Sequence, residues 1–193
     1  RKIFVRLYKD GLIYKAKKLV NWDSKFMTAV SDLEVVQKET VGKMYYYKYP
    51  IKGEEGEFVH IATTRPETMF GDTAVAVSKD NEKLKHLIGK ECIIPIINRA
   101  IPIVADDHAD PEKGTGAVKI TPAHDFNDFE VGKRHNLPLI NILNPDATLN
   151  ENTPFAGMDT QSARKATIAK LEELGFMEKI EDHPMVIPYG DRS

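Results

Sequence analysis

Short runs of β-forming residues dominate this chain and constrain its fold more than any other feature. Turns rich in Gly, Pro and Asn separate these runs. Strands that do not alternate with helices favour an antiparallel-rich barrel or sandwich with attached helices over a chain of βαβ units. The sequence therefore predicts a mainly β fold, with strands over 12–14, 17–21, 34–40, 43–49, 58–63, 73–78, 91–97, 101–105, 117–121 and 139–143.

Helical spacing of apolar residues appears in only four segments. The clearest pattern covers 162–174, where alanine, isoleucine and leucine form one side and Gly175 follows as a stop signal. Asp125 is placed to cap the helix that follows it. The charged, glycine-containing segment 52–57 predicts a hairpin tip. The predicted helices cover 1–10, 81–87, 125–136 and 162–174.

Composition limits the classes of partner. A chain of 193 residues, 41% hydrophobic and 29% charged, fits one soluble globular domain, and its net charge of −2 creates no global attraction to nucleic acid. The first twenty residues are basic, which fits either contact with an RNA backbone or a solvated helix face. The single cysteine, Cys92, excludes an intrachain disulfide. No apolar run is long enough for a membrane span and no signal peptide is visible, so we expect a cytoplasmic location and no membrane partner.

Two segments about fifty residues apart carry the reactive side chains. The first, TTRPET at 63–68, offers hydroxyls and one fixed cation. The second, GTGAVKITPAHDFND at 114–128, offers Lys119 and two carboxylates, Asp125 and Asp128, which share one face if a helix begins at Asp125. We expect its glycine turn to approach a ligand closely. Together the segments favour a site for a cationic, hydroxylated ligand with an ester beside it, although β-propensity and helix capping explain the same residues without a ligand.

These segments resemble the editing domain inserted in class I aminoacyl-tRNA synthetases. The resemblance covers essentially the whole chain, including 21–35, 131–137 and the PYGDRS ending at 188–193. Isoleucyl and leucyl enzymes share the TTRP word and the GTG turn, whereas the full KITPAHD word at 119–125 and the PYGDRS ending resemble the valyl type.

The resemblance implies a closed β-barrel core with peripheral helices. It implies one editing domain fragment over 1–193, with an entry helix and ribbon at 1–35, a barrel core with helices at 36–182 and an exit strand at 183–193. The missing initiator Met also suggests a fragment. The implied activity is hydrolysis of threonine wrongly esterified to tRNA(Val), and the implied partners are the 3′ end of that tRNA and the catalytic core of the synthetase. An isoleucyl or leucyl editing domain is the alternative within the family.

The resemblance also assigns roles to residues. It implies that Asp128 holds the α-ammonium of the substrate and that Lys119 and Thr63 complete the catalytic group. Because the sequence shows neither a Ser-His-Asp arrangement nor a reactive cysteine, we expect water to be the nucleophile. Asp125 is assigned to threonine recognition or to site geometry. The residues expected to bind substrate are Thr64, Arg65, Thr68, Thr121, His124 and Asp125.

The same residues bear on cofactors and on two other classes of function, a metal-dependent hydrolase and an RNA-binding module. The nucleotide-binding words of a class I core are absent, so we expect no cofactor for this domain, and ATP and Mg²⁺ only for a full-length synthetase. The cluster 106–110 together with His124 and Asp125 would suit a metal-dependent hydrolase, but no HExxH or CxxC frame supports it, and we assign no metal ligand. A non-catalytic RNA-binding barrel is the remaining alternative.

Overall fold

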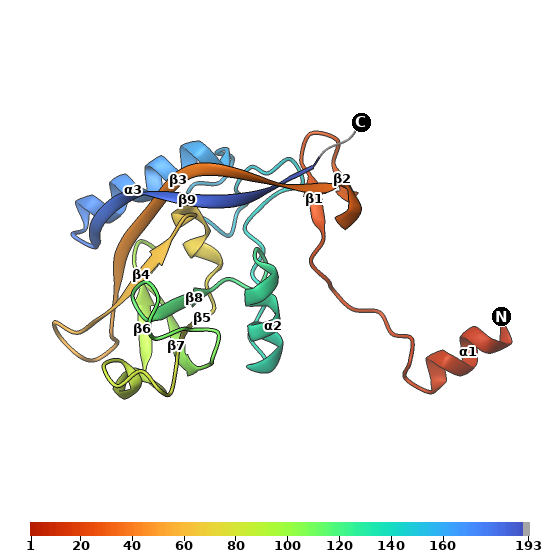
Figure 1. The fold of residues 1–193 in the computed structure, drawn as a ribbon, viewed down its shortest axis with the longest axis horizontal. Helices are drawn as coiled ribbons and strands as arrows, with labels where there is room; N and C mark the ends of the chain where they lie inside the picture. The colour runs from red at the N-terminus through yellow and green to blue at the C-terminus, as the bar shows by residue number, and fades with distance from the viewer. Residues whose placement is uncertain (191–193) are drawn as a thin grey trace.

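A computed structural model describes residues 1–190 of the chain. The strands and two of the α-helices form one body, and α1 (Lys2–Lys9) lies away from it at the end of an extended segment (Figure 1). The helix expected over 1–10 is therefore present. The strands expected over 12–14 and 17–21 are wrong, because this mostly exposed segment has no neighbouring strand to pair with. A small ribbon of β1 (Asn21–Asp23) and β2 (Thr28–Val30) follows.

A long antiparallel ribbon crosses the top of the body in Figure 1. It consists of β3 (Val35–Pro50) and β9 (Met177–Gly190), and β4 (Phe58–Thr63) pairs with the other edge of β3. The two strands expected over 34–40 and 43–49 are thus one continuous strand. Only the end of β9 was expected, as the exit strand over 183–193, of which residues 191–193 lie outside the described range. Charged residues along β9 hide its strand pattern, and its pairing with β3 defines it instead.

The second large sheet has the order β6-β7-β5-β8. It contains β5 (Ala74–Val77), β6 (Glu91–Ile94), β7 (Arg99–Ala105) and β8 (Ala117–Ile120), and only the β5–β7 pair is parallel. The closed barrel expected from the resemblance is wrong for residues 1–190. Their strands divide into separate sheets of two, three and four strands, and between the two larger sheets only an isolated bridge, Ile51 to Cys92, is formed.

The remaining elements lie around these sheets. The helix expected over 125–136 is α2 (Phe126–Arg134), and the one over 162–174 is α3 (Thr160–Glu173), which packs on η2 (Pro66–Gly71). The expected helix over 81–87 is reduced to the single turn η3 (Lys85–Leu87), and another turn, η1 (Asp32–Glu34), precedes β3. The expected strand over 139–143 does not form beyond a bridge at Leu143. Among the described helices, none has the length and apolar content that a bilayer span requires.

The hydrophobic core lies between the two larger sheets. Tyr45, Tyr47 and Tyr49 of β3 point into it, while the side chain of Tyr46 is only half-buried on the other face. Alternate tyrosines of β3 are therefore core residues. A second cluster, formed by Ala74, Ala76, Ala109, Ile120 and Val131, joins α2 to the four-stranded sheet. This packing brings the end of β4 beside the end of β8, where the polar segments lie.

Candidate functional site

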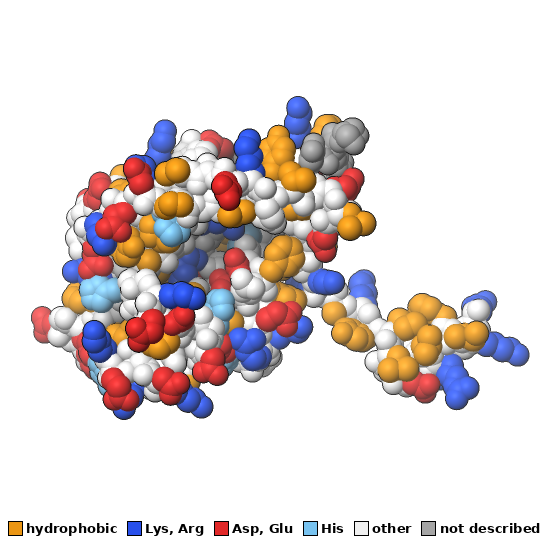
Figure 2. Space-filling model, in the orientation of Figure 1, with side chains coloured by type: hydrophobic (Ala, Val, Ile, Leu, Met, Phe, Trp, Pro, Cys, Tyr) orange, Lys and Arg blue, Asp and Glu red, His pale blue; other side chains and the backbone are white. Residues whose placement is uncertain are grey.

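A pocket of about 230 Å³ opens where β4 runs into η2 and β8 runs into α2. Figure 2 shows a hollow in the surface between the β3–β9 ribbon and the part of the body that holds β8 and α2. The two ends meet because β4 and β8 are neighbours in space although they are distant in sequence. The lining residues are Ala62, Thr63, Thr64, Arg65, Thr68, His108, Val118, Lys119, Thr121, His124, Asp125, Asn127 and Asp128.

The pocket brings together all nine residues singled out from the sequence. It also includes two polar residues that the sequence analysis does not assign to it, His108 and Asn127, and two apolar ones, Ala62 and Val118. His108 was considered only as a metal ligand, and Asn127 lies inside the recognised word without having been given a role. A third residue that was missed, Asp72, lies behind the wall and contacts two of the site's polar side chains, Lys119 and Thr121, and the core residue Tyr49.

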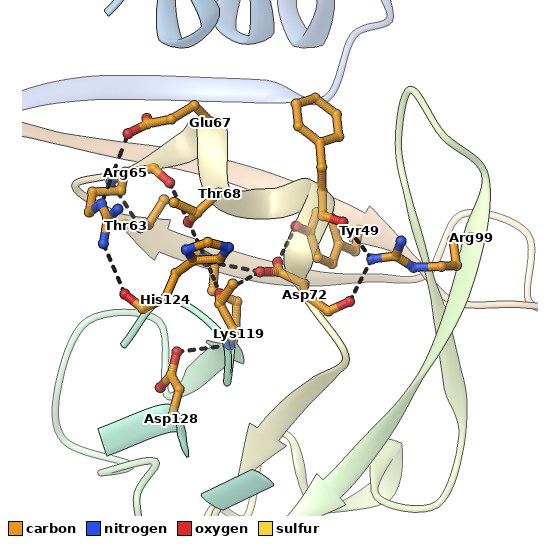
Figure 3. Close-up of polar contacts among 12 residues, drawn as sticks. Tyr49, Thr63, Arg65, Glu67, Thr68, Asp72, Arg99, Lys119, His124 and Asp128 are labelled. Carbon is orange, nitrogen blue, oxygen red and sulfur yellow. Dashed lines mark hydrogen bonds and ion pairs between the residues drawn. The ribbon is translucent and has the colours of Figure 1, made fainter. Parts of the chain in front are cut away.

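Lys119 is the centre of a buried polar network (Figure 3). Its Nζ donates to Asp72 Oδ1 over 2.9 Å and to Thr68 Oγ1 over 3.0 Å, and it also donates to Thr121 Oγ1. The residue is only 7% exposed. A lysine ammonium has three N–H donors, so protein partners take all three. In this state Lys119 has no free donor to offer a ligand, and its contribution to the site is to hold the wall in place.

Asp72 accepts hydrogen bonds from three side chains. Besides the Lys119 ammonium, Thr121 Oγ1 donates to its Oδ1 over 2.6 Å and the Tyr49 hydroxyl donates to its Oδ2 over 2.7 Å. Burial, followed by the nearby negative charge of Asp72, raises the pKa of Tyr49 well above its usual value, so the phenol remains a donor. Arg99 donates to the carbonyls of Phe70 and Asp72, each over 2.8 Å, which anchors the end of η2. Asp72 is fully buried, so the wall has a compensated charge pair behind it.

Asp128 provides the carboxylate that faces the pocket. Its Oδ2 accepts the backbone N–H of Thr121 over 2.8 Å, and His108 Nε2 lies 3.5 Å from its Oδ1. Burial raises the pKa of this carboxyl to about 6, against the lowering effects of the Thr121 N–H and of Lys119. A carboxylate removed from water and short of hydrogen bonds gains strongly from a cation that enters beside it.

The segment 63–68 is held by one hydrogen bond within it and by contacts with His124 and Arg164. Arg65 Nη1 donates to the carbonyl of His124 over 3.1 Å, and Thr68 Oγ1 donates to the carbonyl of Arg65 over 2.8 Å. Arg164 of α3 forms a bidentate pair with the buried Glu67, with both distances 2.8 Å. These contacts fix η2 against α3 and fix the Thr-Arg wall against the segment that precedes α2.

His124 has a structural contact that its place in the motif does not show. Its Nε2 accepts the backbone N–H of Ile142 over 2.9 Å, so the proton of the neutral ring is on Nδ1. Burial, then the positive charges of Arg65 and Lys119, lowers the pKa of His124 to about 4. The ring is therefore neutral near pH 7, and it connects the segment that precedes α2 to the chain around residue 142.

The glycine turn does not line the pocket, although it was expected to lie close to a ligand. Gly114 and Gly116 have positive φ angles of 58° and 75°, and neither residue lines the pocket. A Cβ at Gly116 would lie 2.5 Å from Asn81 Nδ2, and Asn81 Oδ1 in turn accepts the backbone N–H groups of Lys83 and Leu84. The glycines thus allow a tight turn against a buried asparagine directly before β8, the strand that brings Lys119 to the pocket.

The acidic cluster around Asp106 has partners within the protein. Although burial alone would raise it, the pKa of Asp106 is held well below its usual range by hydrogen bonds from Arg134, the His108 N–H and His135. Within residues 1–190, no group of three or more His, Cys, Asp or Glu side chains is arranged to hold a metal ion. Asp106 is therefore an ion-pair anchor between the turn after β7 and the end of α2.

We expect Asp125→Ala and Asp159→Ala to lower the free energy of unfolding by similar amounts, about 1 kcal/mol each. Asp125 Oδ1 accepts the N–H groups of Asn127 and Asp128 at the start of α2, and Asp159 Oδ1 accepts those of Gln161 and Ser162 at the start of α3. The second variant is a matched control because Asp159 does not line the pocket. Denaturant unfolding measures both. A much larger loss for Asp125→Ala would show that its carboxylate stabilises more than a helix end.

Comparison with known proteins gives the family. The family model of class I tRNA synthetases (I, L, M and V) matches residues 1–184. The chain is 54% identical over 215 residues to the valine–tRNA ligase of Nitrobacter winogradskyi, covering 100% of this chain and 23% of that protein. It is 53% identical over 195 residues to the enzyme of Francisella tularensis, covering 100% and 21%. The chain thus spans about a quarter or less of these relatives' length.

Solved structures of leucyl enzymes have the same fold. One is the Agrobacterium radiobacter K84 agnB2 LeuRS in a ternary complex with tRNA and LeuAMS, with a TM-score of 0.57 and 17% identity over 96% of this chain and 31% of that one. Another is GlLeuRS-CP1, with a TM-score of 0.55 and 13% identity over 70% of this chain and 96% of that one. At this identity the likeness concerns the fold, while the family model covers nearly the whole chain. The chain belongs to the class I tRNA synthetases.

Proposed function

We propose that this chain is the editing module of a valyl-type synthetase and hydrolyses the ester between threonine and tRNA(Val). One observation carries the proposal: a shielded carboxylate, Asp128, faces a wall of threonine hydroxyls held by Lys119 and Asp72 in a single pocket. The high identity to valine–tRNA ligases supports the choice of amino acid. The proposed partners are the 3′ end of tRNA(Val) and the catalytic core of the parent enzyme.

The chemistry to be solved is discrimination by one hydroxyl. Threonine is nearly isosteric with valine, and an apolar pocket cannot strongly reject an isostere that adds a hydroxyl, for which valyl-tRNA synthetase is the known example. A second pocket with a polar wall has the opposite preference. Thr68 and Thr121 would bind the threonine hydroxyl, and a valine methyl in its place would leave those groups without partners, at a cost of about 1–3 kcal/mol each.

The geometry suggests a division of roles around the ester. Asp128 binds the α-ammonium and so fixes the reacting carbonyl. Thr63 Oγ1 accepts the N–H of Arg65 over 3.1 Å, and its own proton has no acceptor among the described residues, so it is available to a water or to a developing oxyanion. Thr64 and Arg65 also line the pocket, and in this proposal they bind the terminal nucleotide of the tRNA. Water, oriented by Thr63 and the neighbouring ribose hydroxyl, attacks the carbonyl, and the tRNA hydroxyl leaves.

Deacylation assays test the proposal directly. The chain is incubated with threonyl-tRNA(Val), valyl-tRNA(Val) and threonine esters of leucine- and isoleucine-specific tRNAs, without ATP and with excess chelator. We expect rapid hydrolysis of threonyl-tRNA(Val) only. Equal rates on the threonyl and valyl esters would reject the valyl-type assignment. Activity that is lost with chelator and restored by zinc or manganese would support the metal-dependent hydrolase, and tRNA binding without hydrolysis of any ester would support the RNA-binding module.

Hydrolysis should depend on pH through Asp128. Because burial raises the pKa of the free carboxyl to about 6, kcat/KM for threonyl-tRNA(Val) is expected to fall tenfold per pH unit below that value. The bound ammonium stabilises the carboxylate, so the kcat profile should bend at lower pH. A raised pKa in the folded state also means that this group's contribution to stability is present below pH 4 and is lost as pH rises through 6. A kcat/KM profile flat from pH 5 to 7 would contradict the assignment.

A further inference from the structure

Asp72 lies directly behind the pocket wall. It follows η2, has no exposed surface, and does not line the pocket itself. Its Oδ1 nevertheless accepts hydrogen bonds from two lining residues, Lys119 and Thr121, while Tyr49 donates to Oδ2 from the core side. The carboxylate therefore connects the hydrophobic core to the polar wall of the site.

The contacts of this network fix the direction of each hydrogen bond. A threonine hydroxyl has one proton and two acceptor lone pairs. Thr121 donates its proton to Asp72 Oδ1 and accepts one N–H of Lys119. Thr68 donates its proton to the carbonyl of Arg65 and accepts another N–H of Lys119. The third N–H of Lys119 goes to Asp72.

This arrangement determines which hydrogen-bonding groups of the wall are left free for a ligand. Both hydroxyl protons and all three ammonium protons are used within the protein, while Thr68 and Thr121 each keep one lone pair. The wall built by these residues thus presents hydrogen-bond acceptors and no donor. Without the Asp72 carboxylate, the Thr121 proton and one Lys119 proton would be free to turn toward the pocket. The wall would then present hydrogen-bond donors as well as acceptors.

We infer that Asp72 is a positioning residue that sets the polarity of this wall, so that the pocket selects esters of amino acids whose side chain donates a hydrogen bond from the β-carbon substituent. This inference rests on the proposed function for the identity of the ligand. It adds to that function the direction of the hydrogen bond and the residue that imposes it. A β-substituent of the same size that only accepts a hydrogen bond should be rejected.

Three esters of tRNA(Val) separate donor from acceptor without any mutation. Threonine carries a hydroxyl, its fluoro analogue of the same spatial arrangement, (2R,3R)-2-amino-3-fluorobutyrate, carries a fluorine that accepts weakly and cannot donate, and 2-aminobutyrate carries only hydrogen. We expect the threonyl ester to be hydrolysed roughly 10-fold or more faster than the 2-aminobutyryl ester, and the fluoro ester no faster than the latter. A fluoro ester cleaved clearly faster than the 2-aminobutyryl ester would show that the wall donates, and would overturn the inference.

Asp72→Asn tests the positioning role. The amide keeps the shape of the carboxylate but replaces one acceptor by a donor, so the threonyl-to-fluoro rate ratio should fall by roughly 10-fold. Thr167→Val, which removes a buried hydroxyl bonded to the Ala163 carbonyl within α3, controls for a general loss of stability and should leave the ratio unchanged. A uniform decrease for all three esters in Asp72→Asn would indicate a merely structural role and would overturn the inference.

A measurement without substrate separates the failure of this inference from the failure of the proposed function. The hydroxyl proton of Thr121 should exchange slowly with water in the unmodified chain, as observed by NMR, because it is donated to a buried carboxylate. Exchange should become fast in Asp72→Asn if the variant folds. Rapid exchange in the unmodified chain would reject the fixed polarity even if the threonyl ester is hydrolysed. Slow exchange without hydrolysis of any ester would reject the proposed function and retain the polarity of the wall.

Discussion

Asp128→Ala is expected to slow hydrolysis of threonyl-tRNA(Val) by roughly 10- to 100-fold. The variant removes a charge-assisted contact with the α-ammonium of about 1.5–3 kcal/mol, and a misplaced ester can add to the loss. Single-turnover deacylation measures the effect on the chemical step. The same substitution also removes the acceptor of the Thr121 N–H, so its stability should be measured in parallel by thermal unfolding.

Asp128→Asn separates the charge from the fold. The amide oxygen can still accept the Thr121 N–H, so this variant should unfold at or above the parental temperature, because the carboxylate it replaces is held out of water. Its rate should still fall with the charge. An N-acetylated threonyl ester, which lacks the ammonium, provides the substrate-side control. Parental rates for Asp128→Asn, with the N-acetylated ester cleaved equally well, would place the ammonium contact elsewhere.

Lys119→Met is expected to lower the free energy of unfolding by about 3–5 kcal/mol. The reason is not the lost Coulomb attraction alone. Asp72 is fully buried, and removal of the only ammonium that contacts it among the described residues leaves a carboxylate uncompensated in the core. Urea unfolding monitored by circular dichroism near pH 7 measures the loss.

Two companion variants give this prediction its controls. Lys43→Met breaks an exposed ion pair with Asp182 on the β3–β9 ribbon and should change the stability little, because solvent screens the pair. The double variant Lys119→Met with Asp72→Asn removes both buried charges and should recover much of the stability lost in Lys119→Met. A loss below about 1 kcal/mol for Lys119→Met alone would mean that Asp72 does not depend on the lysine, and the wall would need another explanation.

The sequence by itself determined the features that depend on local pattern. The position of Asp125 predicted the cap of α2, because a helix cap depends only on residues next to it in sequence. The two motif segments also predicted nine of the pocket's polar residues, but not His108 or Asn127. The family resemblance indicated that the two segments form one site, since the spacing of two segments fifty residues apart does not itself show that they meet.

Only the tertiary structure decided the features that depend on distant partners. Asp72 belongs to no motif. Its carboxylate accepts three hydrogen bonds because the fold places Tyr49, Lys119 and Thr121 around it. Tertiary pairing also decided β9, whose charged sequence forms a strand beside β3. It decided the sheet arrangement as well, because the described strands form separate sheets where a closed barrel was expected. In each case the deciding free energy comes from contacts between residues far apart in sequence, and such contacts exist only once the chain is packed.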